Sequence, residues 1–136
     1  MKLTIIQQTI RYWLKTAEHD FVTMQALEKT KRYSDALFFG HIVLEKLLKA
    51  HVVKATHNHA PYIHDLVRLA ALTELQLSTM DTTLLNEVSD FNIRARYPED
   101  KLEFYQRCTK AFATPYIDQI TILYHKLCQT LKQKKS

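Results

Sequence analysis

Glycine is almost absent from this chain, which has one glycine and three prolines among its 136 residues. The tight turns of hairpin-rich sheets depend on glycine, so the composition argues against an all-β fold and favours helices. Glycine-rich phosphate loops and the dinucleotide-binding fingerprint are excluded as well, because both need backbone that approaches a phosphate without a side chain in the way. Any phosphate must therefore be held by side chains or by the N-termini of helices.

Cysteines and long apolar runs are also scarce. The two cysteines, Cys108 and Cys128, do not have the spacing of zinc ligands, and the N-terminal sequence MKLTIIQQTI is too polar for a signal peptide. No window of the sequence approaches the roughly 18 apolar residues that a membrane span needs. We therefore expect a cytoplasmic protein with free thiols and no membrane segment.

Length and composition together predict a single domain, residues 1–136, with its own hydrophobic core. Hydrophobic residues make up 46% of the chain and charged residues 24%, which is typical of a globular protein. The formal net charge is +5, and part of this surplus lies in the C-terminal sequence KQKKS. A basic balance of this size favours an acidic partner such as nucleic acid, a nucleotide or an acidic protein surface.

Apolar residues recur at helical spacing along most of the chain. The pattern predicts an amphipathic helix over 3–29, a central helix over 35–55 that is apolar on most of its circumference, a short helix over 65–75, a fourth helix from 78 or 79 to before Pro98, and a last helix that reaches about 132. Ser34 is the expected N-cap of the central helix. The fold class we predict is all-α, an up-and-down helical bundle of about five helices with two long antiparallel helices at the N-terminus.

Two boundaries stay open in this interpretation. The stretch 99–108 favours an irregular or short helical connection. The last helix has two candidate starts, at Thr109 and at Thr114-Pro115, because threonine caps helices and proline is favoured in their first turn.

A polar stripe on the central helix is the first candidate for anion binding. His41, Glu45 and Lys49 are spaced by four residues, and Lys46 lies beside them, so their side chains share one side of an otherwise apolar helix. The stripe is either a Glu-Lys pair at the solvent edge of the helix or one wall of a groove. In the second case the lysines would meet a phosphate and Glu45 would orient them.

The second candidate is the sequence FNIRARYPED, in which Arg94 and Arg96 precede Tyr97 and Pro98 at the end of the fourth helix. The two cations either complement the negative pole of the helix or bind an anion through the planar fork of guanidinium, with Asn92 holding the geometry. Two residues turn roughly 200° around a helix, so both arginines can face one ligand only if the helix loosens before the proline.

Seven histidines raise the question of a metal site, and the densest group is His57, His59 and His64. Only Asp65 adds a carboxylate at suitable spacing, so the group falls short of the four supported ligands of a zinc site. We predict no metal and no cofactor. His64 is expected to hydrogen-bond at the start of the short helix.

Four stretches, in order along the chain, resemble the HEPN domain. They are AEHDFVTM in the first helix, DALFFGHIVLEKLLKA in the central helix, HDL at 64–66 and NIRARYP at 92–98. The resemblance covers nearly the whole chain. It implies a nucleotide-binding bundle of four or five helices that is frequently a homodimer. It also implies a minimal nucleotidyltransferase as partner, sometimes in a toxin-antitoxin pair.

Many HEPN proteins are metal-independent ribonucleases that use an arginine followed, after four to six residues, by a histidine. In this chain Phe91 stands where that arginine would be and Arg96 where the histidine would be. RNA cleavage needs a group that exchanges protons near neutral pH, and arginine does not, since its pKa lies above about 12. From this resemblance we therefore expect nucleotide or RNA binding in this chain, and we do not expect RNA cleavage.

The sequence thus predicts a non-catalytic protein that binds a nucleotide or an RNA phosphate between the central helix and the fourth helix. The expected binding residues are Lys46, Lys49, Arg94 and Arg96, supported by Glu45, Asn92 and Tyr97. One alternative is a diverged ribonuclease toxin whose proton-transfer group is His41 or His64. Another is a bundle that docks on a nucleotidyltransferase and binds no small ligand.

Overall fold

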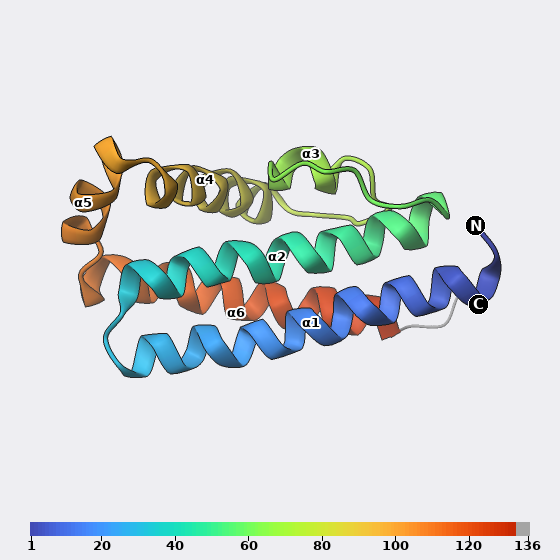
Figure 1. Cartoon of the computed structure of the whole chain (residues 1–136), viewed down its shortest axis with the longest axis horizontal. Helices are drawn as coiled ribbons and strands as arrows, with labels where there is room; N and C mark the ends of the chain where they lie inside the picture. The colour runs from blue at the N-terminus through green and yellow to red at the C-terminus, as the bar shows by residue number, and fades with distance from the viewer. Residues whose placement is uncertain (133–136) are drawn as a thin grey trace.

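The structure is a computed structural model, and it describes residues 1–132. Within these residues it contains helices and no strands, and its helices are α1 (Leu3–Lys29), α2 (Tyr33–Thr56), α3 (Leu66–Ala70), α4 (Thr79–Arg96), α5 (Pro98–Arg107) and α6 (Lys110–Lys132). The two N-terminal helices are long and antiparallel, α4 lies on the other side of α2 from α1, and α5 covers one end of the bundle (Figure 1). The predicted all-α bundle is confirmed. Most of the basic C-terminal sequence, 133–136, lies outside the described residues.

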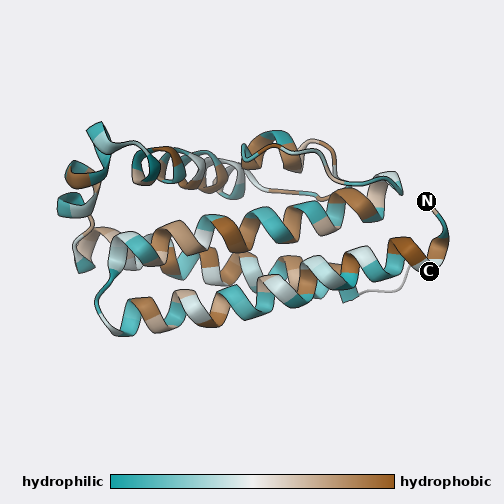
Figure 2. Ribbon diagram, viewed as in Figure 1, coloured by the Kyte–Doolittle hydropathy of each residue, from teal (hydrophilic) through white to brown (hydrophobic). Residues whose placement is uncertain are grey.

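The central helix α2 packs against every other helix of the described part. Apolar residues recur along its length (Figure 2), and Leu37, Leu44 and Leu47 are fully buried. Gly40 marks a close approach of three helices, because a Cβ atom there would lie 2.8 Å from Cδ1 of Ile120 in α6 and 3.4 Å from Sδ of Met24 in α1. A glycine inside a helix costs about 1 kcal/mol relative to alanine, and this packing offsets the cost.

Most helix ends follow local capping chemistry. Ser78 caps α4 in a capping box, in which its hydroxyl accepts from the Asp81 amide and the Asp81 carboxylate accepts from the Ser78 amide. Asp65 caps α3 by accepting from two backbone amides. The predicted cap at Ser34 is wrong, because α2 begins two residues earlier than predicted, at Tyr33, with Arg32 at its N-cap.

Two elements differ in extent from the expectation. The short helix α3 ends at Ala70, five residues before its predicted end. Of the two candidate starts of the last helix, the structure has the one at Thr109, whose hydroxyl accepts from the Phe112 amide. Pro115 therefore lies inside α6. The hydroxyl cap therefore sets the start of the helix here, rather than the proline.

The stretch predicted as irregular or short helical is α5. Tyr97 adopts an extended conformation, with φ −91° and ψ 129°, and it caps both the end of α4 and the start of α5. Proline at 98 disfavours a helical residue before it and suits the first position of the next helix, and Glu99 and Asp100 complement the positive pole there. The chain therefore turns at Tyr97, and α5 packs near the start of α2.

A buried histidine connects α2 to α6. His51 is 4% exposed, and its Nε2 lies 3.0 Å from the carbonyl oxygen of Leu127. Burial lowers the pKa of His51, because the charged imidazole would lose its hydration, and this outweighs the opposing effect of the hydrogen bond. The folded chain therefore holds this side chain in its neutral form at neutral pH.

We expect acid to destabilise the fold through His51. In the unfolded chain its pKa is about 6.5, so below that pH the unfolded state takes up a proton that the folded state does not. The free energy of unfolding then decreases as the pH falls from 7 to 5, by at most about 1.4 kcal/mol per pH unit from this group. Urea unfolding at pH 7, 6 and 5 measures the slope. It should be smaller in His51→Gln, and an equal slope in that variant would contradict the assignment.

None of the helices within residues 1–132 combines the length and the apolar character that crossing a bilayer requires.

Candidate phosphate-binding site

The polar stripe on α2 forms a network of ion pairs. Nζ of Lys49 lies 3.3 Å from Oε2 of Glu45 and 5.5 Å from the centre of the Trp13 ring, and the lysine is only 6% exposed. Lys46 donates to the carboxylate of Asp20 in α1. Each lysine therefore already has a carboxylate partner inside the protein.

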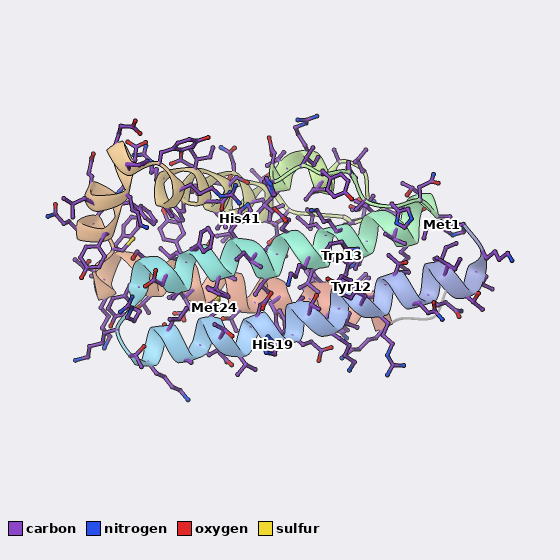
Figure 3. All side chains as sticks on the ribbon, in the orientation of Figure 1. Met1, Tyr12, Trp13, His19, Met24 and His41 are labelled. Atoms are coloured by element: carbon purple, nitrogen blue, oxygen red, sulfur yellow. The ribbon has the colours of Figure 1, made fainter. Side chains whose placement is uncertain are left out.

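Two histidines complete this network at Glu45. Nδ1 of His64 lies 2.7 Å from Oε1 of Glu45, and Nδ1 of His41 lies 4.0 Å from the same oxygen. Nε2 of His41 lies 2.9 Å from the carbonyl oxygen of His64, and His41 sits on the side of α2 that faces α4 (Figure 3). The side chain of His64 is 53% exposed, whereas that of His41 is buried. Burial lowers the pKa of His41. The network thus joins α2 to the loop before α3 and presents one imidazole to solvent.

The histidines do not assemble a metal site. In the part of the chain that the structure describes, no group of three or more histidine, cysteine, aspartate or glutamate side chains is arranged to hold a metal ion. Cys108 and Cys128 are free and buried, and burial raises the pKa of the Cys108 thiol to about 11. These thiols are therefore protonated at neutral pH.

The two arginines at the end of α4 have different environments. Nε of Arg94 lies 2.7 Å from Oδ2 of Asp90, one turn earlier on the same helix. Arg96 is exposed and forms no ion pair with any residue in 1–132. Because α4 remains helical through Arg96, the loosening that would turn both arginines to one ligand does not occur. Of the two, only Arg96 is available to an anion.

Arg96 lines a pocket of about 760 Å³ where three elements meet at the end of the bundle. These elements are the start of α2 with the residue before it, the end of α4, and α5. Asp35 contributes a carboxylate that accepts from Nε of Arg32 at 3.0 Å. The cationic and aromatic side chains that line the pocket are Arg32, Arg96, Lys101, Phe38, Phe104 and Tyr105.

The lysines of the central helix do not belong to this pocket. Phe38 is the last residue of α2 that lines it. A helix rises 1.5 Å per residue, so Lys46 and Lys49 lie roughly 12 and 16 Å farther along the axis. The structure therefore separates the predicted residues into two groups. Glu45 and the two lysines belong to the charge network, and Arg96 belongs to the pocket.

Asn92 and Tyr97 have other surroundings. Tyr97 is 55% exposed at the junction of α4 and α5. Asn92 is 3% exposed, and its Oδ1 has no hydrogen-bond partner among the described residues. It lines a second pocket, of about 490 Å³, together with His64 and Ser89. The hydrogen bonds of the described residues do not connect it to either arginine, so its expected role in holding their geometry has no contact to support it.

Sequence reasoning missed two cations of the larger pocket, Arg32 and Lys101. Arg32 lies in the turn between the two long helices, and Lys101 lies in the first turns of α5. A signal for Lys101 was present in the sequence, because proline followed by two acidic residues is typical of a helix start. The position of α5 against the start of α2 depends on tertiary packing and has no local signal.

Comparison with known proteins identifies a family. Residues 10–129 match the family model of the HEPN domain. The matched range contains the whole charge network and all residues that line the two pockets described above. No curated protein and no solved structure matches the chain.

Proposed function

This chain belongs to the HEPN family, and we propose that it binds nucleotide or RNA phosphates in the pocket around Arg96 without cleaving them. The observation that carries the proposal is the convergence of Arg32, Arg96 and Lys101, from three separate elements, on one pocket of about 760 Å³. Membership of the family supports a role that involves nucleotides or RNA.

The chemistry of these side chains suits a phosphate. The guanidinium of Arg96 can donate two parallel hydrogen bonds to phosphate oxygens, and it has no internal carboxylate partner among the described residues. Lys101 adds a point charge. The Asp35 carboxylate offsets the charge of Arg32. Arg96 and Lys101 then give the lining of the pocket a net charge of two positive charges. An anion with two negative charges would be neutralised there.

Phe91 supports the absence of cleavage. It occupies the position of the arginine in the arginine-histidine ribonuclease pattern, and its ring is 4% exposed. Its centroid lies 5.4 Å from that of Phe104 and 4.9 Å from that of Tyr116. The side chain therefore belongs to an aromatic cluster of the core and has no group that could transfer a proton.

Calorimetric titration with ATP and with inorganic tripolyphosphate tests this proposal. Arg96→Ala should weaken binding of both by about 10- to 100-fold, because charge-assisted hydrogen bonds to phosphate are lost. Arg94→Ala is the matched control, since it removes the same charge from the same helix outside the pocket, and it should change affinity less than about threefold. If the two variants lost affinity equally, binding would depend only on the net charge of the protein, and the proposal would be contradicted.

A diverged ribonuclease is the second candidate, and the geometry of His64 favours it. Glu45 holds Nδ1 of this half-exposed imidazole at 2.7 Å, which leaves Nε2 free, and the ring lines the pocket of Asn92. A histidine oriented by a carboxylate is a common proton-transfer group. A fluorogenic single-stranded RNA decides between the candidates. We expect no cleavage above the blank, whereas cleavage that disappears in His64→Ala would favour the ribonuclease.

We also propose a cytoplasmic homodimer whose partner is a minimal nucleotidyltransferase. The family resemblance supports both associations, and Ile93, Tyr97 and Leu102, each more than half exposed, provide apolar surface near the junction of α4 and α5. Light scattering should give twice the chain mass of 16.0 kDa. Purification from the native host should retain the nucleotidyltransferase. A monomer that retains no partner would contradict this part of the proposal.

A further inference from the structure

The pocket around Arg96 is lined by apolar side chains as well as by cations. Its volume of about 760 Å³ lies within the range of small-molecule pockets, roughly 300–1,000 Å³. A bare phosphate would contact the cations and leave Phe38, Pro98 and Tyr105 without a partner from the ligand. The pocket therefore has both the room and the apolar surface for a group that is attached to the phosphate.

Tyr105 is the aromatic side chain of this pocket that is free to stack on a ligand. Phe104 is 2% exposed and packs in the core, with its ring centroid 5.4 Å from that of Phe91. Phe38 is half-buried, and its ring meets the ring of Phe39 edge-on at 6.2 Å. Tyr105, by contrast, is 66% exposed, and its ring contacts no other ring and no cation within residues 1–132. Its ring is therefore open to a ligand.

The position of Tyr105 on α5 places it beside the cations of the pocket. Pro98, Lys101 and Tyr105 all line the pocket, and they are spaced by three and four residues, so they share one side of α5. Side chains one turn apart have Cβ atoms roughly 5–6 Å from each other. One ribose can span that distance, so a phosphate at Arg96 and Lys101 brings its attached base within reach of the Tyr105 ring.

The side chains that line this pocket leave no group open to read the edge of a base. Adenine is read by asparagine or glutamine, and neither residue type lines the pocket. Cytosine is read by a carboxylate, and the carboxylate of the lining, Asp35, already accepts from Arg32. Guanine is read by arginine or lysine, but in the proposed function Arg96 and Lys101 hold the phosphate. Stacking on an aromatic ring tolerates every base, because each base has an aromatic face.

We propose that the pocket binds a nucleobase together with its phosphate, with the base stacked on Tyr105 and the phosphate at Arg96 and Lys101, and that it accepts all four bases. This inference rests on the proposed phosphate site and adds the base to it. The ligand is a ribonucleotide, either free or within single-stranded RNA, since both present an unpaired base beside a phosphate. Inside a duplex both faces of a base are covered by its neighbours, so double-stranded RNA does not fit this arrangement.

Calorimetry on the unmodified protein gives the first test, in which AMP, GMP, CMP and UMP are compared with ribose 5-phosphate. These ligands share the sugar and the phosphate, so a difference in affinity measures the contribution of the base. Each nucleotide should bind at least about fivefold more tightly than ribose 5-phosphate, and the four should agree within about tenfold. Equal affinity for ribose 5-phosphate and the nucleotides, or a wider spread among the four bases, would overturn the inference.

Three tyrosine variants give the second test. Tyr105→Ala should lower the affinity for UMP to that for ribose 5-phosphate and leave the affinity for ribose 5-phosphate unchanged, whereas Tyr105→Phe keeps the ring and should keep the affinity for UMP. Tyr62→Ala is the matched control, because Tyr62 is fully exposed and does not line the pocket. A Tyr105→Ala protein that binds UMP as tightly as the unmodified protein would overturn the inference.

The same titrations separate this inference from the proposed function. If tripolyphosphate binds and Arg96→Ala weakens it, while UMP and ribose 5-phosphate bind equally, the phosphate site stands and the base site is contradicted. Absence of tripolyphosphate binding would contradict both. Comparison of UMP with single-stranded oligo(U) identifies the source of the base: tighter binding of the oligonucleotide indicates RNA, and equal or weaker binding indicates the free nucleotide.

Discussion

Replacing Glu45 with leucine is expected to lower the free energy of unfolding by about 3–5 kcal/mol, the largest loss of stability that the charge network can produce. Glu45 is the carboxylate partner of Lys49, which is 6% exposed and otherwise faces the ring of Trp13. Without that partner the ammonium group is buried with no compensating charge. Urea unfolding at pH 7 measures the loss.

The double variant Glu45→Leu, Lys49→Met is the control for this effect. It removes both charges and keeps similar volumes, and replacing a whole buried ion pair by apolar residues is often neutral or stabilising. We therefore expect the double variant to recover most of the stability of the unmodified protein. If Glu45→Leu lowered the free energy of unfolding by less than about 1 kcal/mol, the pair of Glu45 with Lys49 would behave as an exposed ion pair, which would contradict the burial of Lys49.

Reversing the charge at Arg96 is expected to abolish phosphate binding. Arg96→Glu would place a carboxylate among Arg32, Lys101 and the incoming phosphate, so affinity for tripolyphosphate should fall by at least about 100-fold. Arg94→Glu gives the protein the same net charge, and we expect it to keep most of its affinity, because Arg94 is paired with Asp90 and does not line the pocket.

Salt separates the local effect from the general one. Attraction by net charge is screened, since the Debye length is about 10 Å at 0.1 M salt. The difference between the two charge-reversal variants should therefore persist when calorimetry is repeated at 0.2 M salt. Variants that become indistinguishable there would show that Arg96 has no direct contact with the phosphate.

The fold was predictable where local signals act alone. The first helix follows its apolar periodicity from Leu3 to Lys29, and the start of α4 follows its capping box at Ser78. The range of α3 was overestimated, because periodicity does not show where the chain leaves the helix. The cap at Ser34 failed because the Arg32 backbone already lies at the N-cap of α2.

The candidate site was predictable only in part. Arg96 is recognisable as a cation at a helix end before a proline, but Arg32 and Lys101 join it only because α5 packs near the start of α2. Lys46 appeared available for an anion because its partner comes from another helix, whereas the pair of Lys49 with Glu45 lies within α2 and was one of the two alternatives that their spacing offered. Asp20, the partner of Lys46, belongs to α1. His64, the second partner of Glu45, belongs to the loop before α3. Such pairs depend on tertiary contacts, which spacing along one helix does not reveal.

A crystal structure of the protein with bound ATP tests the central claim most directly. We predict phosphate oxygens within about 2.7–3.2 Å of the Arg96 guanidinium and of either Arg32 or Lys101. Phosphates held instead by Lys46 and Lys49, with Arg96 turned to solvent, would contradict it.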